Sequence, residues 1–110
     1  MKSFDVLFAH RGAFHRTIVG KVVNIKHYSY VATFCFPDEV LNDNCREMIF
    51  THCQNIDNPW RPNAPCRSMS VGDLILNDKG EYWMVDSVGY LRRNPLVGDI
   101  LDLPAEEDCL

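Results

Sequence analysis

A polar turn between two apolar segments is the clearest pattern along the chain. Residues 74–76 and 82–85 are apolar, and Asn77-Asp78-Lys79-Gly80 separates them. Asn suits the start of a tight turn, and Gly can take the positive φ that a type I turn followed by a bulge requires. The pattern therefore predicts a β-hairpin. A second tight turn, Val71-Gly72-Asp73, directs the chain into the first hairpin strand.

Three further segments, residues 4–9, 17–24 and 28–36, have the β-branched and aromatic content of strands. In the second, Gly20 predicts a bulge or a close backbone approach. In the third, alternation places five side chains on one face: Tyr28, Tyr30, Ala32, Phe34 and Phe36. Such a stripe is typical of a sheet face packed on a helix, and the alternative is a platform on which nucleobases stack.

One amphipathic helix is predicted, from Pro37 or Asp38 to about Gln54. Asp38 and Glu39 would form its acidic first turn. Its apolar stripe consists of residues at steps of four: Leu41, Cys45, Ile49 and Cys53. Because Asn42-Asp43-Asn44 is weak helix material, the alternative is a break and a restart at Cys45.

These elements indicate an α+β fold. A curved antiparallel sheet, open or partly closed into a barrel, packs on one main helix. We expect residues 1–104 to form a single domain, with some strand character at 96–104, and residues 105–110 to form a short acidic tail.

The charge balance is nearly neutral outside that tail. Of the net charge of −4, three charges belong to Glu106, Glu107 and Asp108. The balance argues against non-specific nucleic-acid binding, which needs clustered Lys and Arg. No apolar run has the length of a membrane span, and the N-terminus lacks the apolar region of a signal peptide. We therefore expect a cytoplasmic protein without a membrane contact.

The five cysteines match neither a zinc pattern nor a disulfide framework, because their number is odd and no two are spaced as CxxC. We expect reduced, mostly buried thiols, no cofactor and no metal. Cys66 is the best candidate for a reactive thiol, and it would need His10, His15, His27 or His52 beside it. A metal site built from Cys66 with His10, His15 and His52 has no diagnostic spacing to support it.

A proline-rich loop, residues 54–65, follows the predicted helix and is long for a domain of this size. Long loops without secondary structure often carry function. Trp60 is the largest apolar side chain of the loop, and we consider two roles for it. It anchors the loop to the core, or it is exposed as the anchor of an interface, where Trp is enriched.

The segment Arg67-Ser68-Met69-Ser70 places a guanidinium and two hydroxyls beside a glycine turn, which would suit an anion. We favour the alternative, in which Ser68 and Ser70 bond to the turn backbone and Arg67 pairs with Asp73 or Asp57. No glycine-rich phosphate-binding motif is present in the sequence.

Two motifs together resemble a known group of proteins. One is Asn55-Ile56-Asp57-Asn58-Pro59-Trp60, and the other is Arg67-Ser68-Met69-Ser70-Val71-Gly72-Asp73-Leu74-Ile75, followed by Tyr82-Trp83 and Ser87-Val88-Gly89-Tyr90. Over about residues 28–90 the chain resembles YodL-like domains of large polyvalent proteins of mobile elements, and small phage and plasmid proteins. The helix exit, His52-Cys53-Gln54-Asn55, matches loosely. The resemblance implies a mobile-element origin and an action on a host or competing system, and it implies no reaction.

Our first hypothesis is therefore a non-enzymatic phage or plasmid protein that binds a host protein and inhibits or redirects it, such as an inhibitor of host defence. The predicted contact surface comprises the loop and the adjoining turn: Asn55, Asp57, Pro59, Trp60, Arg61, Arg67, Ser68, Ser70 and Asp73.

Two alternatives come from other classes. The first is a small nucleic-acid-binding module of the compact-barrel type. Its contact residues would be basic and aromatic: Arg11, His15, Arg16, Lys21 and Lys26 beside Tyr28 and Tyr30. The second is a thiol-dependent enzyme that uses Cys66.

Overall fold

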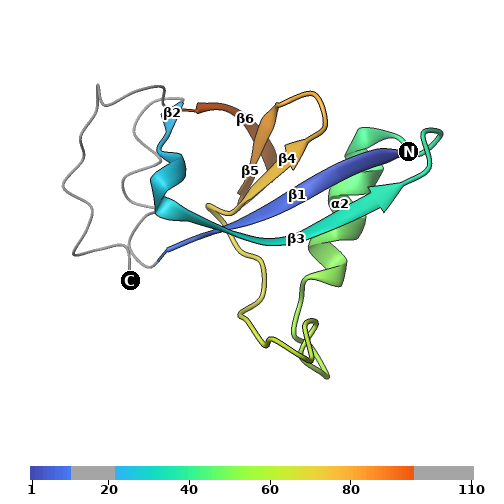
Figure 1. The fold of residues 1–110 in the computed structure, drawn as a ribbon, viewed down its shortest axis with the longest axis vertical. Helices are drawn as coiled ribbons and strands as arrows, with labels where there is room; N and C mark the ends of the chain where they lie inside the picture. The colour runs from blue at the N-terminus through green and yellow to red at the C-terminus, as the bar shows by residue number, and fades with distance from the viewer. Residues whose placement is uncertain (11–21, 96–110) are drawn as a thin grey trace.

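A computed structural model describes residues 1–10 and 22–95 of the chain (Figure 1). Its elements are β1 (Lys2–Ala9), β2 (Val22–Val23), the 3-10 helix η1 (Ile25–His27), β3 (Tyr28–Phe36), α2 (Asn42–His52), β4 (Leu74–Asn77), β5 (Tyr82–Asp86) and β6 (Gly89–Pro95). The strand order is β2-β6-β5-β4-β1-β3, and all neighbours are antiparallel except the short pair β2 and β6. The α+β prediction is confirmed.

The sheet is open in the part of the chain that the structure describes. It ends at β3 on one side and at β2 on the other, so the alternative of a partly closed barrel is wrong. One helix, α2, covers one face of this sheet (Figure 1). Among the described residues, no helix combines the length and the apolar character that a membrane span requires.

The predicted hairpin is β4 and β5. Asn77 closes its turn, because its side-chain oxygen accepts from the backbone N–H of Lys79 at 3.0 Å and of Glu81 at 2.9 Å. Gly80 has a φ of +79°, and Gly72, in the turn before β4, has a φ of +99°. Both values lie in the region where glycine carries no steric cost, which explains glycine at these two positions.

The helix begins later than predicted. Pro37 accepts a backbone hydrogen bond from Val40 at 3.1 Å, and Leu41 is extended at φ −65° and ψ 145°. The acidic residues after Pro37 therefore lie in a turn, and the predicted start at Pro37 or Asp38 is wrong. A lysine near the start of β1, Lys2, donates to the Asn42 side chain at 2.9 Å and also contacts the Val40 carbonyl. This contact fixes the helix start against the sheet.

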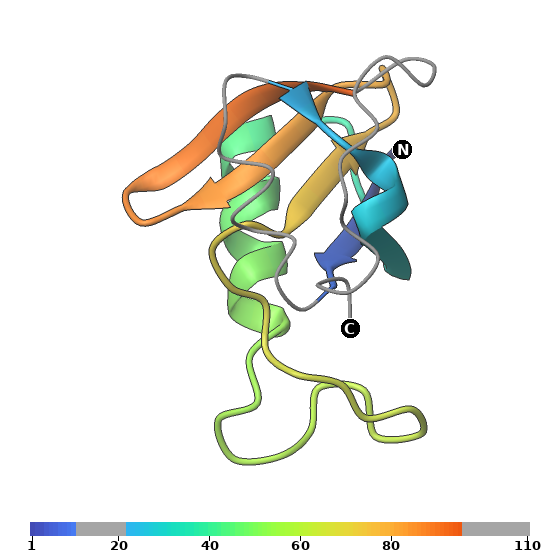
Figure 2. The ribbon, with the colours of Figure 1, turned by 90° about the vertical axis from the view of Figure 1, so that its left-hand side faces the viewer.

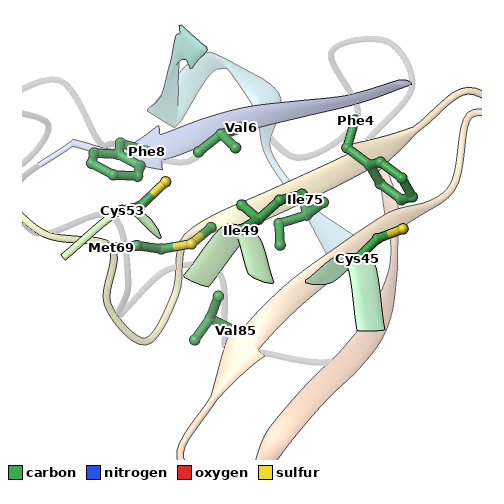
Figure 3. Close-up of a cluster of buried hydrophobic side chains, with 9 residues drawn as sticks. All are labelled: Phe4, Val6, Phe8, Cys45, Ile49, Cys53, Met69, Ile75 and Val85. Atoms are coloured by element: carbon green, nitrogen blue, oxygen red, sulfur yellow. The ribbon is translucent and has the colours of Figure 1, made fainter. Parts of the chain in front are cut away.

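The main core lies between α2 and the sheet. Figure 3 shows nine buried side chains of this cluster: Phe4, Val6, Phe8, Cys45, Ile49, Cys53, Met69, Ile75 and Val85. The predicted stripe residues Cys45, Ile49 and Cys53 all point into it, whereas Leu41 is exposed. Each large apolar side chain buried in this way contributes about 1.5–3 kcal/mol.

A bulge divides the aromatic stripe that alternation predicted for β3. Val6 pairs with Ala32 but Leu7 pairs with Tyr30, so one extra residue, Val31, interrupts the register. A shift of one residue moves side chains to the opposite face. Phe34 consequently packs on the helix side, whereas Tyr28 joins a second cluster on the other face with Val23, Leu74 and Met84, and Tyr30 is exposed. The prediction of one shared aromatic face is wrong.

Several predicted features lie wholly or partly outside the described residues. Of the strand predicted at 17–24, the structure describes β2 alone. The segment 96–104, the tail 105–110 and Gly20 are not described.

Candidate functional site

The loop between α2 and β4 is the predicted contact region. It leaves the helix at Cys53 and extends away from the sheet before it returns to β4 (Figure 2). Residues 54–65 contain no helix or strand, as predicted. Because such a segment has no backbone ladder of its own, its shape depends on side chains that reach its main chain.

Asn55 holds the base of the loop. Its backbone N–H donates to the Ser68 hydroxyl at 2.7 Å, and its side-chain amide donates to the Cys66 carbonyl at 2.6 Å. Its side-chain oxygen accepts from the backbone N–H of Trp60 at 2.8 Å. Asn55 thus joins the outgoing segment of the loop to Trp60 and to the returning segment.

Trp60 anchors the loop to the core. The indole is half-buried, and its ring centroid lies 6.1 Å from that of Phe8, 6.5 Å from that of Phe34 and 6.1 Å from that of His52. Its Nε1–H donates to the Arg67 carbonyl at 3.1 Å, which satisfies the one polar group of the indole. Of the two roles considered for Trp60, the structure supports the anchor to the core.

Arg67 and Asp73 form a bidentate ion pair. Two guanidinium nitrogens donate to the two carboxylate oxygens at 2.7 Å each, and the Asp73 side chain is 0% exposed. Asp73 also accepts from the backbone N–H groups of Ala9 and Ser70 at 2.8 Å. This pairing raises the pKa of the Arg67 guanidinium, chiefly through the hydrogen bond to Asp73.

The same two guanidinium nitrogens form further hydrogen bonds within the chain. They reach the carbonyls of Ala9 and Ser68 at 3.0 Å and the Ser70 hydroxyl at 3.2 Å, while the guanidinium lies 4.4 Å above the Phe8 ring. Arg67 pairs with Asp73, as in the favoured alternative, whereas the Ser68 hydroxyl accepts from the Asn55 N–H in the loop and the Ser70 hydroxyl accepts from Arg67, not from the turn backbone that was predicted. Arg67, Ser68, Ser70 and Asp73 therefore form the neck of the loop.

The outer surface of the loop, unlike the hydrogen-bonded neck, consists of exposed side chains. Ile56 is 82% exposed, and the neighbouring Asp57, Asn58 and Pro59 are exposed as well. These residues line a shallow depression together with Asn55, Pro65 and Cys66. Sequence reasoning did not single out Ile56, although an isolated aliphatic residue among Asn, Asp and Pro was a usable signal. Arg61, also predicted, is partly exposed beside Trp60.

The structure describes Cys66 and three of the four histidines suggested as its partners. Cys66 is a free, partly buried thiol, and in the described ranges it forms no hydrogen bond to a histidine. No group of three His, Cys, Asp or Glu side chains that could hold a metal occurs among residues 1–10 and 22–95. His15, one of the suggested partners, lies outside these ranges.

Comparisons with protein-family models, with curated proteins and with solved structures found no match to this chain. The resemblance to YodL-like proteins therefore stays a prediction.

The aromatic residues of the nucleic-acid alternative occupy two different environments. Tyr28 is buried and its hydroxyl donates to the Gly72 carbonyl at 2.7 Å, so it offers no face to a nucleobase. Tyr30 is exposed, and its hydroxyl is 2.6 Å from that of Thr33. Of the basic residues in that prediction, Lys26 is described, and Arg11, His15, Arg16 and Lys21 lie outside the described residues.

Proposed function

We propose that this chain is a non-enzymatic binding protein that contacts another protein through the outer surface of residues 55–66, here called the contact loop. The observation that supports the proposal is the division of the loop into two sides. Inward-directed hydrogen bonds from Asn55 and Trp60 fix its backbone, while Ile56 is 82% exposed on the outside. A backbone that is already ordered loses little conformational entropy on binding, which favours affinity.

The surface of the contact loop indicates the chemistry of its partner. Ile56 would enter an apolar pocket, and the surrounding Asp57, Asn58 and Pro59 would form a polar rim with few flexible side chains. Many protein interfaces have this arrangement of a small apolar centre and a polar border. From the resemblance to mobile-element proteins, we propose that the partner is a host protein that this chain inhibits or redirects, including one of a host defence system.

Capture of partners by the tagged full-length chain tests the proposal. We would compare the wild type with Ile56→Asp, Arg61→Ala and a matched control, Val88→Asp, in lysate of the cells that carry the gene. Val88 is 92% exposed at the turn between β5 and β6, away from the contact loop. We expect Ile56→Asp to lose at least about tenfold of the captured partner, because burying an unpaired carboxylate is costly. Val88→Asp should capture the wild-type amount.

Trp60→Ala examines the ordering of the loop separately. Without the indole and its bond to the Arg67 carbonyl, we expect faster amide hydrogen exchange in residues 55–66 and weaker capture. The proposal is wrong if Ile56→Asp and Arg61→Ala capture the same proteins in the same amounts as the wild type.

A further inference from the structure

The two edges of the sheet differ in length. One edge is β2, which has two residues, and the other is β3, which has nine. In the described ranges, β3 pairs only with β1. The outer backbone groups over residues 29–36 consequently have no strand partner among the described residues. An edge of this kind is a template for pairing with another strand.

The composition of β3 leaves this edge without most of the usual protection. Its sequence, YSYVATFCF, contains no charge and no proline. Natural edge strands are commonly guarded by Lys, by Pro or by a bulge, and only the bulge at Val31 is present here. Beyond the bulge, residues 32–36 pair in unbroken register with β1. We call residues 32–36 the open edge.

We propose that two copies of this chain join through their open edges as an antiparallel pair of β3 strands, which makes one continuous sheet. A two-fold antiparallel pair places each residue opposite a residue of the same strand in the second copy. A charged side chain would therefore approach a like charge, and the open edge has none. Thr33, Phe34 and Phe36 are of the types that form favourable cross-strand pairs, and the other two residues of the open edge, Ala32 and Cys35, are small and uncharged.

The side of α2 next to β3 supplies a second contact. The His52 ring lies 5.3 Å from the Phe34 ring, which places this side of the helix over the open edge. Met48 precedes His52 by one helical turn, so it lies on the same side, and it is exposed. The two-fold axis of such a dimer is perpendicular to the sheet and keeps both helices on one face. Met48 and His52 then face their counterparts across the axis.

The mass of the full-length chain in solution tests this inference. Sedimentation equilibrium over the micromolar range, with reductant present so that cysteines stay reduced, should give twice the mass of one chain. We expect Cys35→Lys to raise the dimer dissociation constant at least about tenfold, because two ammonium groups enter one symmetric contact. Cys35 is an exposed, free thiol, so the substitution should leave the fold intact, as circular dichroism would show.

Two control variants separate pairing at the edge from other association. Cys35→Ser keeps the edge uncharged and should dimerise like the wild type. Val88→Lys adds the same charge at a residue 92% exposed outside the edge and should also dimerise. A wild type that stays monomeric throughout the micromolar range would overturn the inference, as expected if another segment or another protein covers the edge. A Cys35→Lys variant that dimerises as well as Val88→Lys would overturn it too.

Discussion

Two arginines, Arg67 and Arg46, hold two regions of this molecule in different ways. Arg67, in the neck of the contact loop, forms two bonds of 2.7 Å with the fully buried Asp73. Arg46, on α2, is buried against the sheet with its guanidinium 4.2 Å above the Trp83 ring, and its ion-pair partner Asp43 is exposed. Among the described residues, the Nε of Arg46 has no hydrogen-bond partner. Arg67 is held by directional bonds to a buried carboxylate, whereas Arg46 stacks on an aromatic face and pairs with an exposed carboxylate.

The difference follows from what each region has to fix. The loop has no backbone ladder, so its position depends on directional bonds from Arg67 and Asp73 to main-chain groups such as those of Ala9. The helix α2 has its own backbone hydrogen bonds and an apolar stripe, so Arg46 has only to fill the contact between the helix and the aromatic rings of β5 and β6. A stacked guanidinium is suited to this contact, because its attraction to the ring persists when the helix moves slightly relative to the sheet.

Removal of the buried carboxylate should have the largest effect. We expect Asp73→Ala to lower the free energy of unfolding by about 3–5 kcal/mol, because the Arg67 cation and the N–H groups of Ala9 and Ser70 lose their acceptor. The partial exposure of Arg67 places the value toward the lower end, since water can solvate its freed donors. Urea denaturation measures this difference.

Asp73→Asn provides the matched comparison for this prediction. Its amide oxygen can still accept from backbone N–H groups, so it should lose clearly less stability than Asp73→Ala. If Asp73→Ala costs less than about 1 kcal/mol, the neck is not held by this ion pair.

The sequence predicted those parts of the fold that local signals specify. The hairpin of β4 and β5, with glycine at position 80, follows from turn chemistry within a few residues. Asp73, six residues from Arg67, was one of the two ion-pair partners considered for that arginine, and the structure selects it over Asp57. The bulge at Val31 was not predictable, because it arises from the register between β1 and β3. Neither was the bond from the Ala9 N–H to Asp73, which joins residues 64 positions apart.

The packing of Arg46 on α2 against the sheet was not predicted either, because it too depends on residues far apart in the sequence. Nothing near Arg46 in the sequence indicates that its guanidinium reaches Trp83 on β5, because this contact exists only once α2 lies on the sheet. The late start of α2 at Asn42 was also unpredictable locally, since Asp38 and Glu39 suit a first helical turn as well as they suit the turn they occupy. Sequence patterns thus located the loop and its neck, and tertiary contacts decided which side chains remained outside.

The second largest effect should come from alkaline pH, which lowers the free energy of unfolding through the Cys53 thiol beside the neck. Burial, and then the nearby Cys66 and Asp73, raise the pKa of the Cys53 thiol from 9.0 to about 12. The unfolded chain therefore releases this proton first, and the free energy of unfolding should fall by about 1.4 kcal/mol per pH unit above about pH 9, until the folded thiol ionises near 12. Below pH 9 the thiol is protonated in both states and contributes no pH dependence.

Chemical denaturation at several pH values, with wild type and Cys53→Ala in parallel, measures the contribution of this one thiol. The two proteins share all their other ionisable groups, so the difference between the two slopes isolates Cys53. If the free energy of unfolding falls equally steeply with pH in wild type and Cys53→Ala between pH 9 and 11, the raised pKa of a buried Cys53 is wrong.

The smallest expected effect completes the contrast between the two arginines. Arg46→Met keeps an apolar chain over the Trp83 ring and removes a buried Nε donor that has no partner in residues 1–10 and 22–95. The lost cation–π attraction and the lost pair with the exposed Asp43, which is worth little, are together similar in size to the removed desolvation cost, so the free energy of unfolding should change by less than about 1 kcal/mol. Arg67→Met, measured by urea denaturation alongside it, should cost several times more, since it leaves the Asp73 carboxylate buried without its cation. Equal losses in the two variants would mean that stacking holds α2 as tightly as the ion pair holds the loop, and the distinction between the two regions would be wrong.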